Sequence, residues 1–265
     1  MRLLIILLLF YSCAPTHKLS LPPRPNGSMT GTNIYKTIGA MKWNEREPII
    51  QKEILSGNVP DFLRKFVKIE ASIIDSSTGK EVKAIYFVSP DYLSAGSNAD
   101  WARIPLTPMT AQRIADSLQC FLPTRKMVND IYRQSVVKLE PVPLYALRDS
   151  AIIFYHHHLI IEGQRKGRKG LIAGIKKDVV ISGKLTRDAK TDRVAIYGWH
   201  KPDGKPIQPL YTGHVNWYVD YSHGIRLVYR KIKVNGKWMD YTAVMSHPVY
   251  KRLLCDEEWC DVTRY

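Results

Sequence analysis

The alternation of hydrophobic and polar positions along the chain predicts two β-hairpins. Phe66 to Ile74 and Val82 to Val88 are rich in Val, Ile, Tyr and Phe, and the turn-like run Asp75 to Gly79 joins them. Further along, Asn235-Gly236, a strong short hairpin signal, separates two more strand-like segments. Beyond the first hairpin, the predicted strands are Lys177–Ile181, Arg193–Trp199, Gly224–Val234 and Lys237–Met245.

The middle of the chain has helical spacing instead. Apolar residues three and four positions apart follow Pro108 and Thr110, and they also follow Pro123-Thr124. A third helix is expected from Ser150 to Ile161. Helices grouped between antiparallel strand signals, without regular β-α alternation, predict an α+β fold in a single domain, with central helices packed on a mainly antiparallel sheet.

The first residues have the layout of a bacterial lipoprotein signal. Arg2 precedes the apolar run Leu3 to Phe10, and the small residue Ser12 stands directly before Cys13. The pattern predicts a signal peptide over residues 1–12, a lipidated Cys13 at the start of a flexible tether over 13–33, and one domain over 34–265. Ordinary secretion with an incidental Cys13, or an N-terminal core helix, are the alternatives.

Composition narrows the class of protein. The 265 residues are 45% hydrophobic and 24% charged, which excludes disordered and collagen-like chains, and no apolar run approaches the roughly 18 to 20 residues that cross a bilayer. The net charge of +15 favours an anionic partner, and nine basic residues against two acidic ones lie between Gly163 and Lys190. Export and the lack of a recognition motif argue against nucleic acid.

An oxidising compartment permits a disulfide. Cys255 and Cys260 bracket four residues and can close a small loop, which leaves Cys120 as a buried thiol inside an amphipathic helix. An active-site role for a thiol stays open as the alternative.

The candidate site lies between Lys177 and Arg226, where polar, aromatic and titratable residues are dense. His223 is expected to act as general base or metal ligand, with Asp220 three residues earlier to orient it. His200 and His214 are expected to face it across a cleft. The expected substrate-binding residues are Lys177, Asp178, Arg226, Trp199 and Tyr221. The alternative is a hydrogen-bonded loop scaffold without catalytic function.

A metal centre is a further hypothesis. His214, Asp220 and His223 supply two imidazoles and a carboxylate, and His200 a third imidazole, so a catalytic zinc site is chemically possible. The spacing of these four residues along the chain does not match a specific zinc-binding motif. The run His156 to His158 is expected on a helix, where neighbouring residues are about 100° apart and do not converge on one ion.

Several blocks resemble a family of exported bacterial proteins and lipoproteins that has no established activity. They span about Phe87 to Val228, and the resemblance implies export and a single folded unit only. The blocks are Phe121–Val128, Lys176–Val180, Tyr197–His200, Pro206–Leu210 and Asp220–Val228.

Two functions follow as expectations. The first is a cell-envelope hydrolase, lipid-anchored to the membrane, that acts on glycan or peptidoglycan by His and Asp acid-base or metal-assisted chemistry. The second is a non-catalytic envelope lipoprotein that binds anionic polymer or carbohydrate. Convergence of the carboxylate and the imidazoles in one cleft would favour the hydrolase, and histidines pointing to different surfaces would favour binding.

Overall fold

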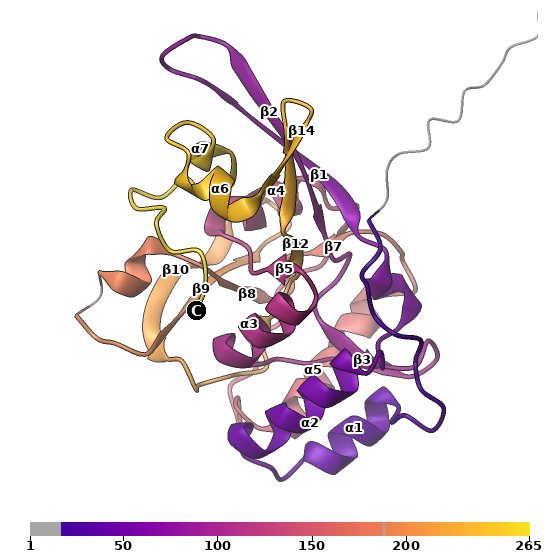
Figure 1. The fold of residues 1–265 in the computed structure, drawn as a ribbon. Helices are drawn as coiled ribbons and strands as arrows, with labels where there is room; N and C mark the ends of the chain where they lie inside the picture. Colours follow the sequence, from indigo (N-terminus) through magenta and orange to yellow (C-terminus); the bar gives the residue numbers. More distant parts are fainter. Residues whose placement is uncertain (1–16, 188) are drawn as a thin grey trace, which may run out of the picture.

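The protein has the expected α+β fold, with helices packed on mostly antiparallel sheets (Figure 1). The computed structural model describes residues 17–187 and 189–265, so the predicted signal peptide and Cys13 lie outside the described residues. Within these ranges, no helix is both long and apolar enough to cross a membrane. The α-helices are α1 (Gly31–Ile38), α2 (Trp43–Leu55), α3 (Pro108–Ser117), α4 (Arg125–Gln134), α5 (Ala151–Arg165), α6 (Tyr241–Ser246) and α7 (Lys251–Leu254).

The larger sheet is built around the two expected hairpins. Its order is β14-β13-β2-β12-β5, and β1 also pairs with β2, in antiparallel register from Val67 opposite Val88. Asn235 and Gly236 both have positive φ values in the β13–β14 turn, which is the geometry that favours these two residues. The strands are β1 (Val67–Ile74), β2 (Glu81–Val88), β5 (Cys120–Phe121), β12 (Val228–Tyr229), β13 (Lys231–Val234) and β14 (Lys237–Asp240).

A four-stranded sheet, in the order β10-β9-β8-β11, carries the candidate site. Its strands are β8 (Lys177–Val180), β9 (Arg193–His200), β10 (Pro206–Val215) and β11 (His223–Gly224). The β8–β11 pair is parallel, whereas the other pairs are antiparallel. The structure also contains two two-stranded sheets. One pairs β3 (Ser94–Gly96) with β4 (Trp101–Arg103), and the other pairs β6 (Val137–Lys138) with β7 (Ile172–Ala173).

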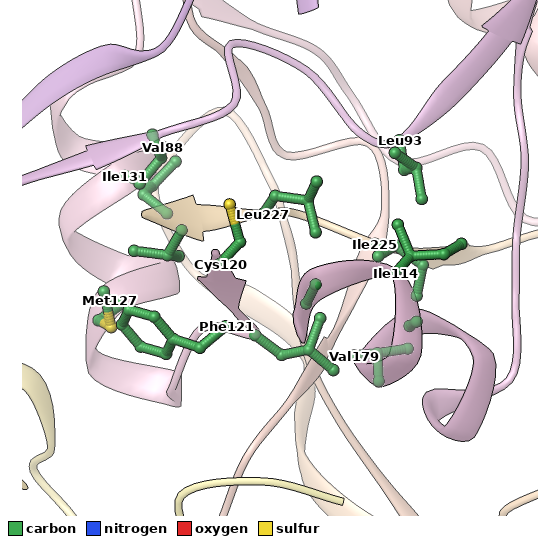
Figure 2. Packing of buried hydrophobic residues seen from close by; sticks show 14 of the residues in the cluster. Val88, Leu93, Ile114, Cys120, Phe121, Met127, Ile131, Val179, Ile225 and Leu227 are labelled. Atoms are coloured by element: carbon green, nitrogen blue, oxygen red, sulfur yellow. The ribbon is translucent and has the colours of Figure 1, made fainter. Parts of the chain in front are cut away.

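The main core lies between the helices and the larger sheet. One buried cluster contains Ile114 of α3, Met127 and Ile131 of α4, Phe121 and Leu227; Figure 2 shows Met127 beside Phe121 and Ile114 beside Ile225. A residue next to the helix caps its N-terminus: the Thr124 side chain, directly before α4, accepts a hydrogen bond from the Met127 N–H. Burial of this apolar surface is the main driving force for the fold.

The segment expected to be a flexible tether is packed where the structure describes it. The Phe66 N–H donates to the His17 carbonyl, and the His17 ring stacks on Tyr229 at 3.6 Å. Leu19 is buried, and its N–H donates to the Arg64 carbonyl. From residue 17 onward the proline-rich stretch therefore belongs to the folded body, because its backbone groups find partners on the domain.

Other boundaries also differ from the expectation. Cys120 lies on β5, just after α3, rather than inside a helix, although its thiol is buried and burial raises its pKa. The strand expected to reach Met245 ends at Asp240, whose side chain caps α6. Strand β10 was not among the expected strands; it lies at the edge of its sheet, where Pro206 and Pro209 are tolerated. Cys255 and Cys260 form a disulfide.

Candidate functional site

The parallel β8–β11 pair places the residues at the centre of the candidate site. His223 lies opposite Lys177 in the register, and Gly224 lies opposite Asp178. A Cβ atom on Gly224 would come within 2.5 Å of the Tyr92 ring, so only glycine permits this close packing. The tertiary pairing thus brings together the two segments that the sequence analysis singled out.

Asp220 is an ionised carboxylate held in a buried position. Its Oδ1 accepts hydrogen bonds from the Ser222 backbone N–H and hydroxyl, and its Oδ2 accepts one from Arg148 Nη2 at 3.0 Å. Burial alone would raise the pKa of Asp220. This effect is outweighed by His223, by the hydrogen bonds from Ser222 and by Lys177, so that the pKa of Asp220 is lowered to about 2. At neutral pH the site therefore contains a fixed negative charge.

His223 is a neutral imidazole next to that charge. Its Nε2 lies 3.9 Å from Asp220 Oδ1, which is longer than a hydrogen bond, and both of its ring nitrogens are buried without a hydrogen-bond partner. Burial lowers the pKa of His223 to about 4, although Asp220 acts in the opposite direction. The expected Asp220–His223 proximity is present, but the ring is closed off from solvent.

His214 is the imidazole that solvent can reach. Its ring centroid lies 6.3 Å from that of His223, and Tyr218 contacts both rings, at 4.6 Å from His214 and 6.0 Å from His223. The His214 side chain is half-buried, and this burial lowers its pKa. The neutral imidazoles of His214 and His223 therefore lie near the Asp220 carboxylate, and only the imidazole of His214 is accessible to solvent.

Lys177 contributes a positive charge on the same side of the sheet. Its Nζ lies 4.7 Å from the centroid of the Trp199 ring, a cation–π contact. Burial lowers the pKa of Lys177, while Asp220 raises it. Lys177 thus lies opposite His223 and packs on Trp199, but both side chains are buried.

His200 lies beside a different cleft, contrary to the expectation that it faces His223. Its ring stacks on Tyr132 at 4.4 Å, and its Nε2 is 3.0 Å from Asn129 Oδ1, which also accepts a hydrogen bond from the Tyr197 hydroxyl. Since Oδ1 can only accept, His200 carries its proton on Nε2. This second cleft has a volume of about 660 Å³, and Arg133 and Lys138 line it.

All five of the expected substrate-binding residues are buried, Lys177 and Trp199 included, and the other three hold elements of the fold together. Arg226 donates to the carbonyls of Ser89 and Ile172 at 2.8 and 2.7 Å, and its Nε lies 3.6 Å from Asp178 Oδ1. Both side chains are almost fully buried. The Tyr221 hydroxyl accepts the Leu144 N–H. These residues connect elements of the fold and do not line a cleft.

An open cleft shares Tyr218 with the histidine pair, although neither histidine lines it, and sequence reasoning missed half of this cleft. The cleft has a volume of about 510 Å³ and is formed by residues 39–43, Arg46, the start of α5 and the 215–219 segment. Tyr218 is part of its wall and also touches His214 and His223. Trp43 and Trp217 line it as well. No motif marks Trp43 or Arg46, which lie more than 170 positions from Trp217 in the chain.

The zinc hypothesis does not fit the geometry. Within residues 17–187 and 189–265, no three His, Cys, Asp or Glu side chains are arranged to hold a metal ion, and this includes His214, Asp220 and His223. The three consecutive histidines of α5 diverge as well: His156 is exposed, His157 packs on Tyr221, and His158 faces Arg103.

No protein-family model, curated protein or solved structure matches this chain. The resemblance of the blocks around Phe121 and Asp220 to exported bacterial proteins therefore stays a prediction.

Proposed function

We propose that the protein is an exported cell-envelope hydrolase that acts on glycan or peptidoglycan by acid-base chemistry. The observation that carries the proposal is the group formed by Asp220, His223 and His214, which Tyr218 connects to an open cleft. A neutral, solvent-accessible imidazole such as that of His214, near an ionised carboxylate, is suited to accept a proton. Buried, perturbed titratable groups next to a cleft are typical of active sites.

In this proposal, His214 is the general base because it is the imidazole of the pair that solvent reaches. It takes a proton from a water molecule that attacks the scissile bond, and it returns that proton to the leaving group. Asp220, held by Arg148 and Ser222, favours the transient positive charge on the imidazoles. Lys177, buried beside Asp220, offsets part of the negative charge of that carboxylate.

The cleft supports a carbohydrate-containing substrate. Trp43 is partly exposed and Trp217 is 48% exposed, so both present ring surface in the cleft wall. Exposed tryptophans offer flat apolar faces with a polar edge, which suits the faces of sugar rings. The net charge of +15 favours an anionic envelope polymer over a neutral one.

Replacing His214 with alanine is expected to lower kcat/KM for hydrolysis of purified peptidoglycan or acidic glycan by roughly 10²-fold to 10⁴-fold, the usual contribution of a general base. Product release is measured by chromatography of soluble fragments. His156→Ala, on the exposed face of α5, and His200→Ala, in the second cleft, are the matched controls and retain activity. Wild-type activity that survives in His214→Ala would contradict the assignment.

Export and lipid anchoring at Cys13 belong to the same proposal. The signal-like residues 1–12 and the Cys255–Cys260 disulfide, which needs an oxidising compartment, support it. Cells fed labelled palmitate are expected to incorporate label into the wild-type protein and into Cys120→Ser, but not into Cys13→Ser. Label in Cys13→Ser, or an unlabelled wild type, would refute the lipid anchor.

The non-catalytic alternative is supported by the position of His200. Because this histidine lies beside a separate aromatic cleft with Tyr132 and Tyr197, the protein has two open clefts that can hold envelope carbohydrate. Saturable binding of wild-type protein to peptidoglycan, without release of soluble fragments, would favour this alternative.

A further inference from the structure

One end of the Trp43–Trp217 cleft is lined by a buried arginine whose hydrogen-bonding capacity is only partly used. Arg46 is only 5% exposed, and its Nε is buried without a hydrogen-bond partner. Its Nη1 reaches the Met41 carbonyl at 3.5 Å, and its guanidinium lies 4.9 Å from the centroid of the Phe154 ring. A buried charged group with a free donor is unfavourable unless a ligand or water completes it.

The first turn of α5 lines the same end of the cleft. Ser150 caps the 15-residue helix and takes the Ile153 N–H, and the N–H groups of Ala151 and Ile152 have no acceptor within the helix because they lie in its first turn. Asp149, Ser150 and Ala151 all belong to the cleft lining. The positive end of the helix dipole and the guanidinium of Arg46 therefore line the same cleft, and Asp149 beside the helix start is close enough to Arg46 to act on its charge.

The charge of the lining limits which anion fits. Lys42 and Arg46 contribute two positive charges, and Asp149 contributes one negative charge beside the helix start. A doubly charged phosphate would meet more repulsion from Asp149 than a singly charged carboxylate, and the planar guanidinium suits a carboxylate.

We propose that this end of the cleft binds a carboxylate of the envelope polymer, so that the substrate of the proposed hydrolase is a carboxylate-bearing glycan of the peptidoglycan type. Arg46 and the first turn of α5 hold the carboxylate, and Trp43 and Trp217 contact the sugar. This inference rests on the proposed function for the reaction, but it makes a separate claim about binding.

The test measures binding by isothermal titration with two probes, a peptidoglycan disaccharide-peptide with free carboxylates and the same fragment with its carboxylates amidated. The protein is the full chain with His214→Ala, so that the probes stay intact. Loss of hydrogen bonds to a charged group predicts that Arg46→Gln weakens binding of the free fragment roughly 10-fold to 100-fold and leaves the amidated fragment unchanged. Trp217→Ala weakens binding of both.

Arg168→Gln, an exposed arginine outside both clefts, is the matched control and leaves both affinities unchanged. If Arg46→Gln unfolds, Lys42→Gln is used in its place, because Lys42 is exposed. Lys42→Gln is expected to weaken binding of the free fragment, but not of the amidated fragment, by a smaller factor. Equal wild-type affinity for the two fragments, or an Arg46→Gln affinity equal to wild type, overturns the inference. Carboxylate-dependent binding in a protein that hydrolyses nothing would instead refute the proposed function and leave this inference standing.

Discussion

Replacing Arg103 with methionine is expected to lower the free energy of unfolding by about 3 to 5 kcal/mol. Arg103 is 1% exposed, and it donates to both carboxylate oxygens of Asp91, at 2.9 Å through Nε and 2.6 Å through Nη2. Its Nη1 donates to Glu162 at 2.8 Å. The substitution leaves the fully buried Asp91 carboxylate without its cation, and an unpaired buried charge is strongly destabilising.

Urea unfolding followed by circular dichroism measures this effect. Lys68→Met is the matched control, because Lys68 and Glu70 form an exposed ion pair whose loss is expected to change stability by less than about 1 kcal/mol. The double substitution Arg103→Met with Asp91→Leu removes both buried charges and is expected to recover much of the loss. A loss below about 1 kcal/mol for Arg103→Met would show that the Arg103–Asp91 pair does not hold β4 to the segment between β2 and β3.

Acidification is expected to destabilise the protein through its buried histidines, and His157 provides the sharpest test. Burial lowers the pKa of His157 to about 2, and Lys176 and Arg103 act in the same direction, while Asp220 opposes them. The unfolded chain takes up this proton near pH 6.5. The folded pKa is therefore depressed, so the stability contributed by the neutral ring is present above pH 6.5 and is lost as pH falls toward 2.

Between pH 6 and pH 4, His157→Leu is expected to reduce the slope of unfolding free energy against pH by about 1.4 kcal/mol per pH unit, the value for one proton. The measurement is a series of urea unfolding curves across that range. His156→Gln, one position earlier and exposed, is expected to leave the slope at the wild-type value. Parallel wild-type and His157→Leu plots would mean that His157 does not titrate differently in the two states.

Local pattern was sufficient to predict those elements whose signals lie within a few residues. The β1–β2 hairpin was predicted from alternation, and its register from Val67 to Val88 buries one face as that alternation requires. The turn at Asn235-Gly236 was predicted because few other residues adopt positive φ easily. Helices α3, α4 and α5 start at Thr107, Thr124 and Ser150, whose side chains satisfy the first N–H groups. The spacing of Cys255 and Cys260 likewise allowed the disulfide that the structure contains.

The candidate site depends on contacts between distant segments, which local pattern does not encode. The sequence by itself placed Asp220 next to His223, but only the parallel pairing of β11 with β8 brings Lys177 opposite His223 and directs Arg226 and Asp178 into the interior. The same holds for the cleft, since Arg46 and the start of α5 meet the 215–219 segment through packing. His200 separates from His223 because its ring packs on Tyr132 of α4. The sequence alone thus determined the hairpins, the helix starts and the chemical groups near the site, whereas the tertiary structure decided which of those groups face a cleft, because burial and pairing depend on the whole chain.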